Sequence, residues 1–338
     1  MANSKSQKTA DTWVVVAFSV LCLLIAVFLV FTFITAGGQT SELVQDKAVA
    51  EVLSDYFDKK PAQITAEDLA SVQYFSFTGG NSLSLGGADA IAEIESEEAT
   101  EESTSVKSFS ISADFDDFNA VLALFPNLKY FSAPSVSSRY FSKIDQLSAC
   151  KDLQYLTLTS AKLSSLEGLD SFTNLKSLTL DKVALSEEDT ARIGKLPALT
   201  ELSVSECGIK DLAFASSLAS LESLYAGSNE ISDVSPLKEL KSLVTLSLEN
   251  NEGITDVEAL SGLTELKSLN LQNTGVKDWS VLDAIKENCT ITGAPEEETK
   301  TEEEAQTSTT EEPKTEEKNT EEAVTNEPET KEKTTSEN

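Results

Sequence analysis

Carboxylates, hydroxyls and tyrosines are the chemically capable side chains that this chain offers in number. Its 338 residues include 57 Asp and Glu but no histidine. The absence of histidine excludes serine–histidine and cysteine–histidine nucleophilic sites, and also zinc sites with histidine ligands. No phosphate-binding glycine loop is present, and carboxylate pairs mean little in so acidic a sequence. The sequence therefore predicts a protein that is not an enzyme and has no catalytic, cofactor or metal site.

Binding is the chemistry that remains, and a few large or charged side chains are placed for it. They stand among serines and threonines on one predicted surface: Tyr74, Tyr130, Tyr155, Tyr225, Asp181, Glu201 and Glu249. Tyrosine on a rigid scaffold offers contact area at low entropic cost. Tyrosine also packs well within strands, so each one is either a contact residue or a packing residue. We expect Tyr130 and Tyr155 to be neighbours, and the three carboxylates to favour a partner with basic groups.

A repeat positions these residues. An apolar residue, two variable residues, an apolar residue, one variable residue and an apolar residue return about every 22 positions. The first unit, residues 72–105, is 34 residues long and carries an acidic insertion at 88–105. The nine units begin at Val72, Val106, Leu128, Leu153, Leu175, Leu199, Leu221, Leu243 and Leu266.

One such unit cannot bury its apolar side alone, so the units must stack into a solenoid. Alternation along each short strand directs two apolar residues inward and the residues between them to the opposite face. Later units add a second signature on the returning side, such as Ile231-Ser232-Asp233-Val234. There the aspartate can accept hydrogen bonds from backbone N–H groups of the turn.

These units resemble bacterial leucine-rich repeats of the internalin type, and residues 221–237 match that pattern best. Asn229 and Asn251 occupy the asparagine position of the family, whereas other units have different residues there. The resemblance implies an α/β solenoid with short parallel strands on its concave face. It also implies a role in protein–protein recognition.

The charge limits the class of partner, and the cysteine content bears on disulfides. The formal net charge of −31 argues against nucleic acid as a partner, because phosphates would be repelled. Beyond Cys22, the cysteines at 150, 207 and 289 are odd in number and fall in different units. This pattern predicts buried thiols and no disulfide framework.

Residues 13–36 are predicted to be a transmembrane signal anchor. The stretch 13–34 has no charge and would span about 33 Å as a helix, enough for a hydrocarbon core of ~30 Å. Lys5 and Lys8 precede it and no Lys or Arg follows until Lys47, so residues 1–12 should be cytoplasmic and the repeats extracellular. The alternative is a signal peptide that is cleaved, which would release a secreted binding protein.

Three further segments flank or interrupt the solenoid at 72–293. Residues 41–71 are predicted to be a helical cap, with a helix from Ser41 to Lys60 begun by Thr40 or Ser41 and a second start at Thr65. The insertion reads as a solvated loop or, less simply, as a cation site. Residues 294–338, rich in Glu, Thr and Lys, are predicted to be a disordered tail.

Taken together, these features predict a protein of the cell membrane whose extracellular repeats bind another protein in adhesion or surface recognition. The competing interpretation is a structural component that scaffolds the bacterial cell envelope. A short linker at residues 37–40, which would hold the solenoid near the bilayer, supports that alternative.

Overall fold

The computed structural model describes residues 43–295 except 79–81, 97–104 and 112–116. The chain divides into two units, Met1–Pro295 and Glu296–Asn338, and every described residue belongs to the first. The α-helices are α2 (Lys47–Phe57), α3 (Ala66–Ser71), α4 (Ala88–Glu95), α5 (Phe118–Leu122) and α6 (Glu187–Ile193). The 3-10 helices are η1 (Pro61–Gln63), η2 (Ile144–Leu147), η3 (Leu169–Ser171), η4 (Ala213–Ser217), η5 (Ser235–Leu237), η6 (Glu258–Leu260) and η7 (Ser280–Leu282).

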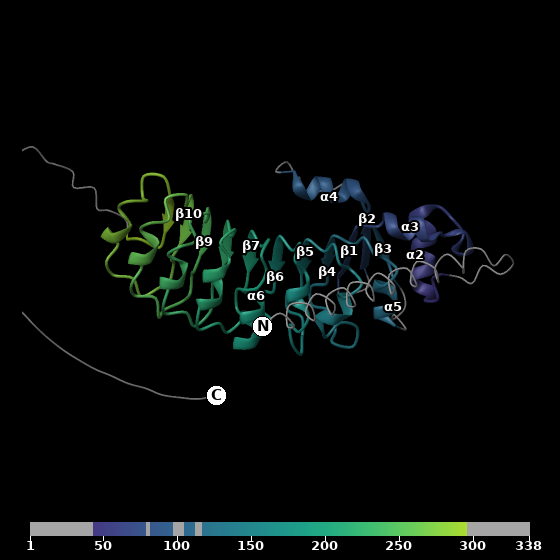
Figure 1. Cartoon of the computed structure of the whole chain (residues 1–338), viewed down its shortest axis with the longest axis horizontal. Coiled ribbons are helices and arrows are strands. Elements are labelled where there is room, and N and C mark those ends of the chain that lie inside the picture. Colours follow the sequence, from purple (N-terminus) through teal and green to yellow (C-terminus); the bar gives the residue numbers. More distant parts are fainter. Residues whose placement is uncertain (1–42, 79–81, 97–104, 112–116, 296–338) are drawn as a thin grey trace, which may run out of the picture. The chain divides into compact units, whose positions relative to one another are not determined.

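Eleven short strands form one sheet. They are β1 (Tyr74–Thr78), β2 (Ser82–Gly86), β3 (Val106–Ser110), β4 (Tyr130–Ser132), β5 (Tyr155–Thr157), β6 (Ser177–Thr179), β7 (Glu201–Ser203), β8 (Ser223–Tyr225), β9 (Thr245–Ser247), β10 (Ser268–Asn270) and β11 (Thr290–Thr292). From β4 to β11 each strand pairs in parallel with the next, and β4 also pairs in parallel with β1 (Figure 1). The predicted solenoid with parallel strands on one face is therefore confirmed.

Burial follows the predicted alternation. The middle residue of each strand from β4 to β10 is almost fully buried, as at Leu156, Leu202 and Leu246, whereas the first residue of each is at least partly exposed. The residues of α2 and α3 contribute to the same apolar core as the strands, through Val52, Leu53 and other side chains. The core is thus continuous from the N-terminal helices through the repeats.

The returning side of the later repeats is built as the aspartate signature predicts. In each of four successive turns, the aspartate carboxylate accepts a hydrogen bond from the backbone N–H two residues further on. The pairs are Asp211 with Ala213, Asp233 with Ser235, Asp256 with Glu258, and Asp278 with Ser280. These bonds begin η4, η5, η6 and η7 on the side of the sheet opposite its open face.

A left-handed residue closes the strand-side turn of each repeat. It stands five positions after the first residue of the strand, as Ser135 follows Tyr130 and Asn250 follows Thr245. These residues have φ between 54° and 62°, and they are Ser135, Ser160, Lys182, Glu206, Ser228, Asn250 and Asn273. Asparagine tolerates this conformation best among them, and Asn273 also donates to the side chain of Asn250 at 2.7 Å.

Two asparagines, the fully buried Asn251 and the half-buried Asn229, bind successive turns together. Asn251 is fully buried, and its amide donates to the carbonyls of Ala226 and Leu248 at 3.0 and 2.9 Å. Its Oδ1 accepts from the N–H of Ile231 at 3.0 Å. Asn229 repeats the arrangement one turn earlier, accepting from the N–H groups of Cys207 and Ile209. Both asparagines predicted from the family pattern therefore satisfy backbone groups of neighbouring turns, and those bonded to Asn251 are buried.

The second predicted repeat is wrong. Val106–Ser110 is not a parallel strand between those of the first and third units, because β1 pairs directly with β4. Instead β1, β2 and β3 are antiparallel neighbours, and β3 ends the sheet. Few residues separate β1 from β2, and so short a connection returns a chain antiparallel, whereas a parallel strand needs a crossover. The parallel strand that was not anticipated is β11, at the other end.

The predicted loop at 88–105 is also wrong in part. Ala88–Glu95 is the helix α4, which buries Ala90 and Ile91 and exposes Asp89 and Glu95. Apolar side chains at helical spacing decided the outcome over the acidic composition. Of the remaining acidic residues of the insertion, those at 97–104 lie outside the described residues.

The first helix of the cap begins later than predicted. It runs from Lys47, and Asp46 caps it by accepting hydrogen bonds from the N–H groups of Ala48 and Val49. Thr65 caps α3 as expected, in a reciprocal pair with Asp68. Within the described ranges no helix is long and apolar enough to cross a membrane, and the predicted anchor at 13–36 lies outside them.

Replacing Asn251 with Ala should destabilise the protein by about 2–4 kcal/mol, since the Ile231 N–H and the buried Leu248 carbonyl would lose their partner. Urea unfolding followed by circular dichroism measures this change. The control is Asn288→Ala, which removes an exposed amide and should change stability by less than about 0.5 kcal/mol. Equal stability of the two variants would contradict the role given to Asn251.

Candidate functional site

The open face of the sheet is the candidate site, and we call it the concave face. It consists of the side chains at the first and third positions of the strands, together with the residues that follow directly, opposite the buried middle residues. The helices α5 and α6 lie on the other side of the sheet, whereas α4 lies over the concave face (Figure 1). Most strand side chains of this face are serine or threonine, which leaves the larger residues prominent.

Three tyrosines form a row on this face. Tyr74, Tyr130 and Tyr155 are paired in register on β1, β4 and β5. The rings of Tyr74 and Tyr130 are stacked, with centroids 4.4 Å apart and planes 9° from parallel. The rings of Tyr130 and Tyr155 are 6.2 Å apart at 33°. The predicted neighbours are therefore confirmed, and Tyr74 joins them because β2 and β3 fold away to the edge. We call these three residues the tyrosine row.

Tyr74 is the most enclosed member of the tyrosine row. Burial, followed by the neighbouring Tyr130, raises the pKa of its phenol to about 12. A Cβ on Gly86 would come within 2.6 Å of the Cβ of Ala90 and 3.2 Å of that of Tyr74, so glycine there permits the close approach of α4. One end of the row is therefore held by packing against the inserted helix.

The other end of the row is held by charge. The Glu95 carboxylate, at the end of α4, accepts from Lys176 Nζ at 2.8 Å and from the Tyr155 hydroxyl at 3.4 Å. Lys176 Nζ also lies 5.9 Å from the centre of the Tyr155 ring. The hydrogen bond from Lys176 lowers the pKa of Glu95, and the same bond raises the pKa of Lys176. This contact joins the insertion to the start of β6.

The remaining predicted residues lie further along the face and are not brought to the tyrosine row. Tyr225 is on β8, between Ser203 and Ser247 in register, and Glu201 on β7 is exposed. Asp181 accepts from the Ser203 hydroxyl at 2.7 Å and the Ser205 N–H at 2.8 Å. Glu249 accepts from the Ser247 hydroxyl and from Asn270 at 3.1 Å. Two of the three carboxylates are thus already fixed in direction.

Sequence reasoning missed Glu95 and Lys176. Glu95 was one of many carboxylates in the insertion, and its partner is 81 positions away in sequence. The available signal was the alternation of Ala90, Ile91 and Ile94 with acidic residues, which is typical of a half-buried helix. Nothing in the local sequence of Lys176 marks it, because lysine before a strand also occurs at Lys129 and Lys267.

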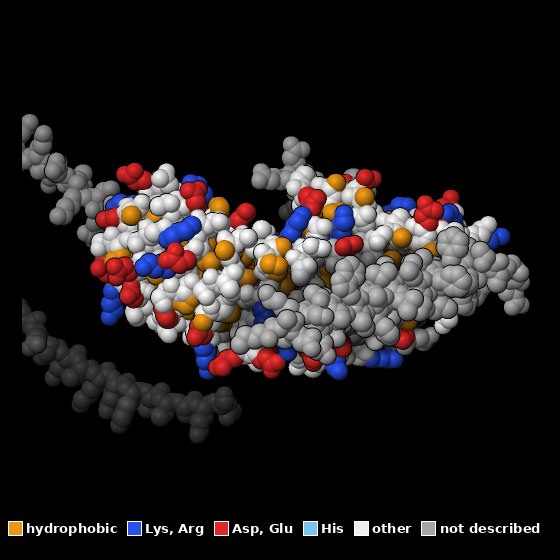
Figure 2. Space-filling view, in the orientation of Figure 1, with side chains coloured by type: hydrophobic (Ala, Val, Ile, Leu, Met, Phe, Trp, Pro, Cys, Tyr) orange, Lys and Arg blue, Asp and Glu red, His pale blue; other side chains and the backbone are white. Residues whose placement is uncertain are grey.

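The arrangement is suited to binding. Hydroxyls, tyrosine rings and oriented carboxylates offer hydrogen bonds and contact area over consecutive strands. Acidic and basic side chains are interspersed on the side of the repeats seen in Figure 2. In the parts of 43–295 that are described, no group of three or more Cys, Asp or Glu side chains could hold a metal ion.

Glu95→Gln should loosen α4, because the neutral amide loses the charge that attracts Lys176. We expect the exchange protection of the α4 amides to fall about two- to fivefold, as for an exposed ion pair. Since the folded pKa of Glu95 is lowered, the contact is complete above the ordinary value of 4.5 and is lost as pH falls through the folded value. Hydrogen exchange measured by mass spectrometry, corrected for intrinsic rates, reports both effects.

Glu265→Gln is the matched control, because it removes one negative charge from an exposed position remote from α4. It should leave α4 protection unchanged. Equal protection of α4 in the Glu95→Gln and Glu265→Gln proteins would show that packing alone holds the helix.

Comparison with known proteins agrees with this geometry. A family model described as leucine-rich repeats, in two copies, matches residues 241–284. No curated protein matches the chain. Among solved structures, an internalin from Listeria monocytogenes is 22% identical with a TM-score of 0.48, and the match covers 75% of this chain and 83% of the internalin.

Internalin C2 from the same organism is 19% identical with a TM-score of 0.52, and the match covers 75% of this chain and 95% of that protein. At this identity the similarity establishes the fold. The resemblance to bacterial internalin-type repeats, predicted from sequence, is thereby confirmed for the architecture. Residues 241–284 are leucine-rich repeats, and the chain has a leucine-rich repeat fold similar to that of internalin C2.

Proposed function

We propose that this chain is a non-catalytic recognition protein whose concave face binds another protein. The observation that carries the proposal is the tyrosine row followed by hydroxyl-bearing strands and Tyr225 on one continuous surface. Solenoids of this kind use such extended concave surfaces for binding. The leucine-rich repeat fold is consistent with this role.

Rigidity supports the proposal. The backbone of each strand from β4 to β10 is bonded to the strands on both sides, and the side chains beneath it are buried. Asp181 and Glu249 are held by hydrogen bonds within the face, so little side-chain entropy is lost when a partner binds them. A surface prepared in this way favours a partner that is itself folded.

The side chains indicate the chemistry of that partner. Tyr225 stands alone among small residues, with Ser203 and Ser247 on either side, and Glu201 is exposed one strand away. An isolated aromatic ring surrounded by hydroxyls and carboxylates suits a partner that presents an apolar side chain beside lysine or arginine. We therefore propose Tyr225 as a central contact residue.

Photo-crosslinking in the cells that make the protein tests this proposal. A photoreactive amino acid at Ser203, the register neighbour of Tyr225, should give a discrete protein adduct, and Tyr225→Ser should lower its yield about tenfold, the effect of ~1.4 kcal/mol of lost contact. The same amino acid at Glu239, on an exposed turn after η5, is the matched control. Adducts formed only from position 239, or unaffected by Tyr225→Ser, would refute the assignment of the face.

We further propose that residues 13–36 anchor the chain in the cell membrane with the repeats outside. The support is the uncharged stretch and the lysines that precede it. The location would restrict the partner to proteins on the outer side of that membrane.

Protease treatment of intact cells tests the location. An immunoblot against an N-terminal tag should find a short membrane-bound fragment, while the repeats disappear before the cells are lysed. A second blot for a cytoplasmic protein controls for cell integrity. Repeats that resist protease until lysis would place them inside the cell and remove the proposed class of partner.

A further inference from the structure

A groove between α2 and β3 lies at the N-terminal edge of the sheet, two strands beyond the tyrosine row. Its volume is about 310 Å³, and it is lined by Ala48, Glu51, Val52, Asp55, Ser108, Phe109, Ser110 and Ile111. We propose that an extended segment of a partner protein, with alternating apolar and basic side chains, binds there by adding a strand to β3. This is a second binding surface, independent of the function proposed for the concave face.

One wall of the groove is a sheet edge. β3 is the last strand of the sheet, and its one neighbour in the described part of the chain is β2. The backbone groups on the outer side of such a strand are a template for another strand, and proteins that recognise extended peptides use this mode. Five residues, Val106–Ser110, provide the edge.

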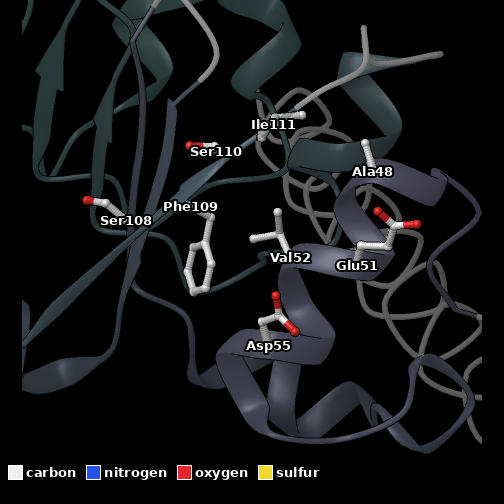
Figure 3. A pocket seen from close by; sticks show the side chains of 8 residues that line it. All are labelled: Ala48, Glu51, Val52, Asp55, Ser108, Phe109, Ser110 and Ile111. Atoms are coloured by element: carbon white, nitrogen blue, oxygen red, sulfur yellow. The ribbon is translucent and has the colours of Figure 1, made fainter.

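The other wall is a single stripe of α2. Ala48, Glu51, Val52 and Asp55 are spaced three and four residues apart, so they project from the same side of the helix. In Figure 3 the ring of Phe109 projects from β3 toward Val52, and together they form an apolar floor. Val52 is buried and Phe109 half-buried, so the floor is partly accessible.

Charge at the groove indicates the partner. Glu51 and Asp55 are exposed on α2, and Glu51 is paired with Lys47 at 3.9 Å, whose side chain is 91% exposed. Lys107 is the opposing charge on β3. Its Nζ donates to the backbone carbonyl of Tyr56 at 3.3 Å and lies 5.4 Å from the centre of the Tyr56 ring. Two carboxylates beside an apolar floor favour lysine or arginine next to an apolar residue.

The size of the groove limits its occupant. Ligand pockets range over ~300–1,000 Å³, so 310 Å³ accepts the side chains of a short segment and not a folded domain. A strand places alternate side chains on opposite sides, which matches an apolar floor with carboxylates at its rim. An alternating peptide satisfies the backbone edge, the floor and the rim together.

A synthetic peptide of alternating Val and Lys, fluorescently labelled, is the probe for the full-length protein in detergent. We expect it to bind at least tenfold more tightly than the peptide of alternating Val and Glu. Binding should slow hydrogen exchange in residues 106–110. The same Val-Lys peptide with N-methyl groups on alternate residues keeps its charge but cannot form the ladder, so it should lose at least tenfold in affinity.

Two double variants separate the groove from the general acidity of the chain. Glu51→Lys/Asp55→Lys should lower the affinity for the Val-Lys peptide at least tenfold, while the circular dichroism spectrum and the melting temperature stay near those of the parent protein. Glu67→Lys/Glu239→Lys makes the same change in net charge at exposed positions outside the groove, and it should lower the affinity for the peptide far less. The proposal is overturned if both double variants weaken binding equally, if N-methylation has no effect, or if the Val-Lys peptide does not bind.

Discussion

The pairing of each strand with the next, over a continuous layer of buried leucines, is the interaction on which the rest of this structure depends. No repeat has enough apolar surface to fold alone, so each is stabilised by its two neighbours. That constraint fixes the backbone of the concave face and therefore the spacing of everything displayed on it. It also explains why the two ends differ from the middle, since each end must be completed by something other than a repeat.

At the N-terminal end the completion is an antiparallel addition. The strands β2 and β3 extend the sheet beyond β1, and α2 packs beside them with Tyr56 against Phe109. The result is a segment with two roles in the proposals above. It fills the end of the solenoid, and it presents a groove beside a sheet edge.

Periodicity in the sequence was sufficient for the repeats from Leu128 onward, because there each apolar position is buried for the same reason in every copy. It failed at residues 106–111, where the spacing of Val106, Phe109 and Ile111 matches a repeat although β3 is an edge strand paired antiparallel with β2. The tyrosine row was predictable for Tyr130 and Tyr155, which are in adjacent parallel repeats. Tyr74 could not be assigned to the tyrosine row without knowing the position of β2. The contact between Glu95 and Lys176 was not predictable either, because no local pattern encodes it.

The left-handed residue of each repeat divides it into a strand-side part of fixed length and a returning part of variable length. Its distance from the start of the strand is constant at five positions, from Tyr130 to Ser135 through Ser268 to Asn273. The return to the next strand varies in length, and in one case it includes an α-helix, α6, in place of a 3-10 helix. Insertions and deletions are therefore absorbed on the back of the molecule. Evolution can lengthen, shorten or rebuild the returning side without shifting any residue of the concave face, so the two surfaces can change independently within one chain.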